Sequence, residues 1–147
     1  MRPDTELAVR LLHEKDQTKL RRDNARYLEN IESRLRDETP ILGVISAGFS
    51  AGEVRPGQLY GDQHDVGVVA VSGYGMHWAG IRETYDWSWD EVRTYGFKAG
   101  GAFRGVPTLW ITFRDDGQFA FRIGEKRESA ESFMRAVDER HLDKPKL

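Results

Sequence analysis

The stretch TLWITFRDDGQFAFRI, residues 108–123, alternates apolar and polar residues on both sides of an Asp-Asp-Gly. Alternation with a period of two is typical of a β-strand with one buried face, and Asp-Asp-Gly is typical of a turn. The stretch therefore predicts an antiparallel hairpin. Its large apolar residues share one face, and Trp110 and Arg122 lie on the other face.

The register of this hairpin follows from matching apolar residues across the two strands, because opposed residues share a face. A two-residue turn would set Phe113 against Ala120. A three-residue loop, with Gly117 in the left-handed conformation, matches apolar with apolar and is the loop that we predict. It also sets Trp110 opposite Arg122, within reach of a cation–π contact. The predicted pairs are 113 with 119, 111 with 121 and 109 with 123.

A second hairpin is predicted from VAVSGYGMHW, residues 69–78. A two-residue turn at Gly73-Tyr74 separates its strands. This turn pairs large apolar residues, which supports the assignment. The predicted pairs are Val71 with Met76 and Val69 with Trp78.

Three aromatic residues follow in TYDWSWDEV, where Tyr85, Trp87 and Trp89 occupy alternate positions. In an extended segment all three would share one face. They form either part of the core, or a layer over it, or an exposed platform for a partner. We favour the core.

Residues 4–38 contain no Gly or Pro and are predicted to be helical. Asp4 is the expected N-cap, and Thr39-Pro40 is the expected stop. The segment 13–19 has no apolar residue, so the pattern leaves open whether there is one helix or two. An apolar stripe at helical spacing needs a surface to cover it, either the chain's own sheet or a second copy. We predict that it binds a partner, with a neighbouring subunit taking part. The stripe consists of Leu20, Tyr27, Leu28, Ile31 and Leu35.

Residues 125–141 return to helical spacing after the β-rich region. Their apolar positions follow an i, i+3, i+4, i+7 pattern, so this helix should lie on an apolar surface. The chain order is then strand, long loop, hairpin, strand, glycine-rich link, hairpin and C-terminal helix. The predicted buried residues of the helix are Ala130, Phe133, Met134 and Val137.

This order resembles the pleckstrin-homology-like (PH-like) barrel, and the bacterial PH-like group in particular. The resemblance rests on VAVSGYGMHW (69–78), YDWSWDEVRTY (85–95) and the closing hairpin with its helix, and it covers about residues 41–141. It implies an α+β fold, in which a small antiparallel β-barrel or sandwich is capped by a C-terminal helix and preceded by an N-terminal helix. We therefore expect a helical extension at 1–38 and a PH-like domain at 39–147.

Composition excludes several chemistries. The chain has no cysteine, which rules out disulfides, thiolate catalysis and cysteine-held metals. Its first residues lack a long apolar run, so we expect neither a signal peptide nor a membrane span and predict a cytoplasmic location. No nucleophile elbow or phosphate-binding glycine loop is present. Asp62, His64 and Asp65 are the best candidates for metal ligands, but four scattered histidines make a metal-dependent enzyme unlikely. We expect no catalytic residue, cofactor or metal.

Charge bears on the binding partners. The loop at 51–64 offers one arginine against two acids, which disfavours recognition of a phospholipid headgroup. Arg93, Lys98 and Arg104 are a possible anion-binding set around the glycine-rich link. Residues 19–36 carry six basic and three acidic residues, too small an excess to predict nucleic-acid binding. By elimination and by fold analogy, we predict a non-catalytic module for protein–protein interaction or self-assembly as a homo-oligomer. A peripheral headgroup-binding module is the alternative, although membrane binding is not expected.

Overall fold

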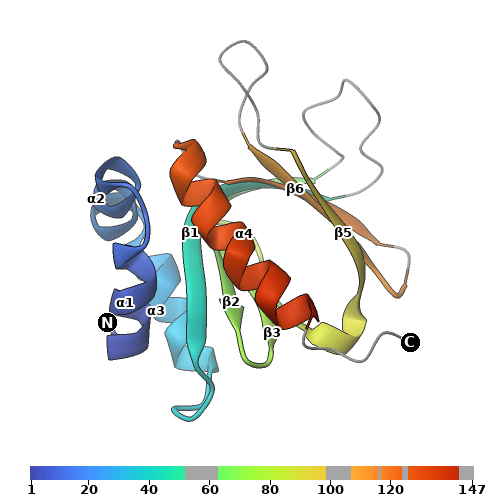
Figure 1. The fold of residues 1–147 in the computed structure, drawn as a ribbon, viewed down its shortest axis with the longest axis horizontal. Coiled ribbons are helices and arrows are strands. Elements are labelled where there is room, and N and C mark those ends of the chain that lie inside the picture. The colour runs from blue at the N-terminus through green and yellow to red at the C-terminus, as the bar shows by residue number, and fades with distance from the viewer. Residues whose placement is uncertain (52–62, 99–106, 116, 124–125, 143–147) are drawn as a thin grey trace.

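The structure, a computed structural model, describes residues 1–51, 63–98, 107–115, 117–123 and 126–142 (Figure 1). Its strands form one antiparallel sheet in the order β4-β3-β2-β1-β7-β6-β5. The helices are α1 (Pro3–Arg10), α2 (Glu14–Asp23), α3 (Ala25–Arg34) and α4 (Arg127–Leu142), with a 3-10 turn η1 (Trp89–Glu91). The strands are β1 (Ile41–Ala51), β2 (Gln63–Ser72), β3 (Gly75–Gly80), β4 (Thr84–Ser88), β5 (Val92–Lys98), β6 (Thr108–Phe113) and β7 (Gln118–Ile123).

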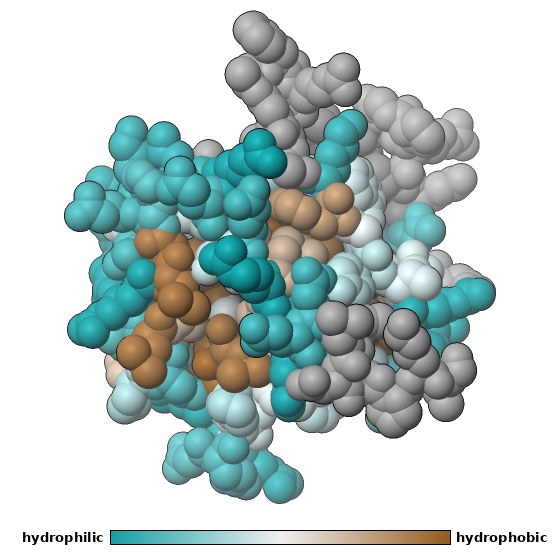
Figure 2. Space-filling model, in the orientation of Figure 1, coloured by the Kyte–Doolittle hydropathy of each residue, from teal (hydrophilic) through white to brown (hydrophobic). Residues whose placement is uncertain are grey.

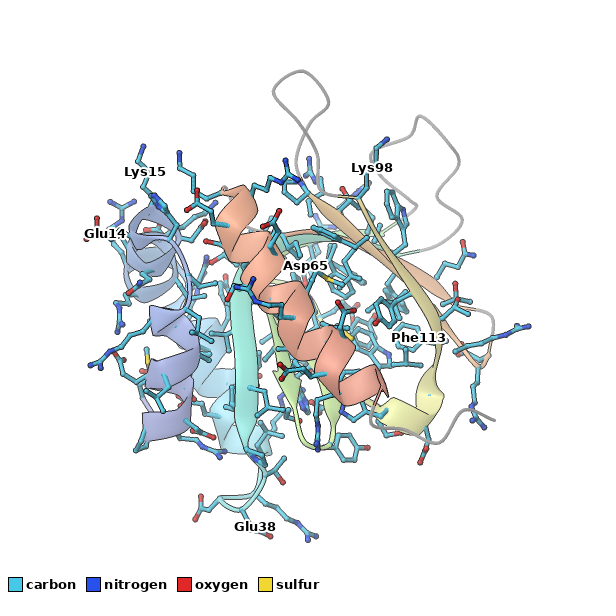
Figure 3. The ribbon with its side chains drawn as sticks, viewed as in Figure 1. Glu14, Lys15, Glu38, Asp65, Lys98 and Phe113 are labelled. Carbon is cyan, nitrogen blue, oxygen red and sulfur yellow. The ribbon has the colours of Figure 1, made fainter. Side chains whose placement is uncertain are left out.

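The sheet curls around a core because β1 belongs to both of its halves. Over its whole length β1 pairs with β2, and from Ala47 to Ala51 it also pairs with β7. Helix α4 lies across the open side of the curled sheet (Figure 1). Phe113 points into the interior (Figure 3). This is the predicted α+β fold, a curled antiparallel sheet with a C-terminal capping helix.

The capping helix packs with the face that its sequence predicts. Ala130, Phe133, Met134 and Val137 are all buried in the barrel core. Gly43 on β1 lets the helix approach, because a Cβ there would lie 3.1 Å from the Cβ of Ala136.

The N-terminal segment forms three helices rather than one or two. Pro3 occupies the first turn of α1, where its missing N–H is no loss. Asp4 is therefore not the N-cap; its carboxylate accepts from the N–H of Ile41 at 2.8 Å and joins α1 to the start of β1. His13 caps α2 by accepting from the N–H of Lys15 at 3.1 Å. Between α2 and α3, Asn24 turns into the protein and donates to Ser46 Oγ at 2.8 Å.

The apolar stripe of these helices is covered by the chain's own sheet, whereas we predicted that a neighbouring subunit takes part. Leu20, Tyr27, Leu28 and Ile31 are buried and Leu35 is partly buried. The surface beneath them is the outer face of β1–β3, the side that points away from the barrel interior. It consists of Ile41, Val44, Val68, Ala70 and Ala79. The stripe is thus occupied within the chain.

The 69–78 hairpin has the predicted register, with Val71 opposite Met76 and Val69 opposite Trp78. The aromatic residues that follow belong to the core, as we favoured. Trp87 and Trp89 are buried, and Tyr85 packs against the same cluster.

The predicted register of the closing hairpin is wrong by two residues. The structure pairs Leu109 with Phe121 and Ile111 with Phe119, and the N–H of Phe113 donates to the carbonyl of Gly117 at 2.9 Å. Gly117 does not have the positive φ that the predicted loop needs. Alternation fixes which residues share a face, but a slip of two residues leaves every side chain on its face. The observed partners on the outer face are Trp110 with Ala120 and Thr108 with Arg122.

Candidate functional site

Of the candidate metal ligands Asp62, His64 and Asp65, the last is a structural carboxylate. Asp65 is buried, and its two oxygens accept from Trp78 Nε1 at 3.2 Å and from the N–H groups of Val66 and Glu83 at 2.9 and 3.0 Å. His64 is exposed on β2, and Asp62 lies outside the described residues. Among the residues that the structure describes, no group of three His, Cys, Asp or Glu side chains is placed to hold a metal ion.

A chain of hydrogen bonds joins Ser72, His77, Asp86 and Arg34, and sequence reasoning missed it. Ser72 Oγ lies 2.6 Å from His77 Nε2, and His77 Nδ1 lies 2.7 Å from Asp86 Oδ1. The other carboxylate oxygen of Asp86 pairs with Arg34 of α3 at 2.8 Å. His77 and Asp86 face each other across β3 and β4. Only the pairing of two separate strands brings them together, so the local sequence held no signal for this chain.

The hydrogen-bond partners of Ser72 fix the protonation of His77. Ser72 Oγ accepts from the N–H groups of Tyr74 and Gly75 at 3.1 and 3.3 Å, which occupies both of its lone pairs. Its own proton must therefore go to His77 Nε2, and the imidazole donates from Nδ1 to Asp86. His77 is neutral in this arrangement.

Ser72, His77 and Asp86 are hydrogen-bonded in the order of a hydrolase triad, but here they stabilise the fold. Ser72 is 0% and His77 1% exposed, so no substrate carbonyl can reach the hydroxyl. The two N–H groups that could serve as an oxyanion hole already bind Ser72 Oγ itself. The chain instead fixes the β2–β3 turn, which also binds Trp89, Pro40 and Arg140 through backbone atoms of Ser72 and Gly73.

We expect the stability contribution of His77 to fall as the pH drops below 6.5. Burial lowers the pKa of His77 below its usual 6.5, more than the Asp86 carboxylate raises it, and Arg34 adds to the lowering. The unfolded chain then binds the proton at a higher pH than the folded chain, so the contribution is complete above pH 6.5 and declines towards the folded pKa. Urea unfolding of wild type and His77→Asn above and below pH 6.5 measures this. The stability gap between the two should narrow at low pH, and a gap that widens would contradict the assigned protonation.

The second candidate is the outer face of β5–β7, on which Trp110 is the central residue. Helices α1–α3 pack mainly on β1–β3, on the other part of the sheet (Figure 1). Trp110 is 39% exposed and stands between Gly96 on β5 and Ala120 on β7. We call this surface the Trp110 face. Its outward residues are Thr94, Gly96, Lys98, Thr108, Trp110, Thr112, Gln118, Ala120 and Arg122.

The space above Gly96, beside Trp110, is open. A Cβ added to Gly96 would meet no atom of the described residues within 4 Å, its two chain neighbours aside. On the other side, Ala120 is buried although it faces outward. Since β5 is the last strand of the sheet, the open space above Gly96 lies at a sheet edge.

The Trp110 face carries positive charge without acidic residues. β5, β6 and β7 contain no Asp or Glu, although the chain has 24 of them. Lys98 pairs with Thr108 and Thr108 with Arg122, so the two cations flank β6 about 10 Å apart. Lys98 points away from the barrel (Figure 3). The Arg122 guanidinium lies over Gly48 of β1.

The predicted anion-binding set is not brought together as a group in the described residues. Arg93 lies in the bulge between Val92 and Thr94, whereas Lys98 ends the same strand. Arg104 falls outside the described residues. Lys98 and Arg122 are instead the two cations that flank the same residue, Thr108, across the strands. We had predicted that Arg122 contacts Trp110.

A rival surface lies on α1. Figure 2 shows apolar side chains gathered on the part of the molecule where Figure 1 places this helix. Leu7 and Leu11, one helical turn apart, are 64% and 63% exposed. Two leucines form a small patch, and such patches are common on the surfaces of monomeric proteins.

Comparison with known proteins gives a fold likeness. No protein-family model matches the chain, and no curated protein matches it. Among solved structures, the chain is similar to the Vps36 N-terminal PH domain, with 14% identity and a TM-score of 0.48. The match covers 71% of this chain and 83% of that chain. In the described part of the chain, no helix combines the length and apolar character needed to cross a bilayer.

Proposed function

We propose that this chain is a non-catalytic binding module that docks another protein chain, a second copy included, through the Trp110 face. The observation that carries the proposal is Trp110 itself, a large aromatic side chain that is 39% exposed on the outer face of the sheet between Gly96 and Ala120. Trp and Arg are the residues most enriched at the energetic centres of protein interfaces. Trp110 and Arg122 lie on the neighbouring strands β6 and β7, and Arg122 is two residues along β7 from Ala120, the partner of Trp110.

Two features support this surface over the others. The apolar stripe of the N-terminal helices is already occupied by the chain's own sheet, which leaves it nothing to offer a partner. The buried Ser72–His77–Asp86 chain is closed to substrate, which favours binding over catalysis. The location in the cytoplasm and the membership of the bacterial PH-like group remain part of the same proposal.

The test uses the absence of cysteine. Because the chain has none, Thr112→Cys places a single thiol on the Trp110 face, where a photo-crosslinker can be attached. We expect adducts with a protein chain from this position and none from Glu29→Cys on α3. Adding Trp110→Ala should weaken docking by about thirtyfold, the effect of losing about 2 kcal/mol at an interface centre. Equal adduct yields with and without Trp110 would contradict the proposal.

A further inference from the structure

We propose that the segment bound at the Trp110 face is acidic and carries a planar side chain that stacks on Trp110 in the open space above Gly96. This rests on the proposed function and names the chemistry of its partner. Three observations bear on it: the open space above Gly96, the charge of the face and the spacing of its rows.

The space above Gly96 suits a flat group. It lies beside Trp110, the cross-strand partner of Gly96, and at the edge of the sheet, since β5 is the last strand among those that the structure describes. Aromatic rings prefer offset or tilted contact with an indole, which a ring entering from the edge can make. An added Cβ on Gly96 would meet no described atom within 4 Å, its chain neighbours aside, so an atom placed there displaces none of them.

The charge of the face selects an acidic partner. The chain as a whole has a net charge of −2, yet β5–β7 have no acidic residue and present Lys98 and Arg122 outward. Carboxylates are the groups complementary in charge to these two cations.

The same charges disfavour nucleic acid, which also combines flat rings with negative charge. Tight nucleic-acid binders make about 6–10 phosphate contacts. The outward residues of the described face include two cations, Lys98 and Arg122. A peptide with one or two carboxylates matches this number.

The spacing of the rows defines the arrangement within the peptide. Lys98 and Arg122 are the cross-strand partners of Thr108, which lies two residues along β6 from Trp110. The line of residues that contains the two cations is therefore about 7 Å from the line that contains Trp110. Residues i and i+2 of an extended chain are separated by the same distance and share a face. The expected arrangement is therefore an aromatic residue with an acidic residue two positions away.

The probe is the synthetic peptide GSESYSESG, in which Glu lies two positions on each side of Tyr. Its controls are GSKSYSKSG, which reverses the charge, and GSESASESG, which removes the ring. Binding is followed by the NMR shift of the Trp110 indole N–H. We expect GSESYSESG to bind about tenfold more tightly than either control.

The matched protein variants are Gly96→Val, which fills the open space, and Thr94→Val, which places a valine on the same face of the same strand without adding volume. Gly96→Val should weaken binding of GSESYSESG about tenfold and Thr94→Val by less than about twofold, with unchanged circular dichroism. Equal binding of the lysine peptide, tighter binding of oligothymidine, or no effect of Gly96→Val would overturn the proposal. If Trp110-dependent protein adducts form while GSESYSESG does not bind, the partner chemistry is wrong and the proposed function stands.

Discussion

A chain that begins at Glu38 is expected to lose cooperative folding, because the N-terminal helices cover an apolar sheet face. Removing them uncovers the outer sides of Val44, Val68, Ala70 and Ala79. It also removes the six buried apolar side chains that pack on this face, and burying each large one contributes about 1.5–3 kcal/mol. The total stability of a domain this size is about 5–15 kcal/mol, so the loss is comparable with all of it. The six are Ala8, Val9, Leu20, Tyr27, Leu28 and Ile31.

Thermal unfolding followed by circular dichroism, together with light scattering, measures this. The shortened chain should lack a sharp transition and should aggregate, whereas full-length Leu7→Ser, altered at an exposed position of α1, should unfold like wild type. A shortened chain that stays folded, and differs from the full chain only by becoming monomeric, would restore the assembly role that we first predicted for the stripe. The result also decides whether the predicted boundary at 38/39 separates two independent units.

Asp65→Ala is expected to destabilise the protein by about 3 kcal/mol or more. The carboxylate satisfies Trp78 Nε1 and the N–H groups of Val66, Arg82 and Glu83. Alanine leaves the buried Trp78 Nε1 and three part-buried N–H groups without this acceptor, and an unsatisfied buried donor costs about 1–3 kcal/mol. The carboxylate also occupies the space beside Gly80, where a Cβ would lie 2.2 Å from Asp65 Oδ2.

Urea unfolding gives the comparison, and the neighbouring His64→Ala is its control. His64 is exposed on the same strand, so this variant should stay within about 0.5 kcal/mol of wild type. Asp65→Asn keeps one oxygen acceptor and should fall between the two. If Asp65→Ala is as stable as His64→Ala, the carboxylate has no structural role, and a ligand-binding role for it would have to be considered again.

The sequence predicted faces better than it predicted partners across strands. It placed Leu109, Ile111 and Phe121 on the buried face of the closing hairpin, but alternation cannot distinguish registers that differ by two residues. The 69–78 hairpin was predicted correctly because its two-residue turn leaves one register that pairs the large residues, such as Val69 with Trp78.

The sequence of β2 partly predicts which surface the apolar stripe of the N-terminal helices covers. Residues 68–71, VVAV, are apolar without alternation, which indicates a strand buried on both faces. One face belongs to the barrel core, and the other therefore needs a cover from the same chain. A strand that is buried on both faces predicts a second layer outside the barrel, and the helices of residues 4–38 have the apolar residues to form that layer.

The candidate site was only partly predictable. Alternation placed Trp110 and Arg122 on the outer face, and the structure bears this out. The open space above Gly96 depends on how β5 pairs with β6, and the proximity of Lys98 to Arg122 depends on three strands at once. Such relations between strands far apart in the chain have no local sequence signature.

The most direct measurement of the central claim compares crosslinking from the Trp110 face with crosslinking from the rival surface on α1. The full chain is labelled with the same photo-crosslinker at Thr112→Cys or at Leu7→Cys, one thiol in each, and the adducts are quantified under identical conditions. The account predicts protein adducts from Thr112→Cys that disappear with Trp110→Ala, and background yields from Leu7→Cys. Adducts that form from Leu7→Cys, in a yield that Trp110→Ala leaves unchanged, would contradict it.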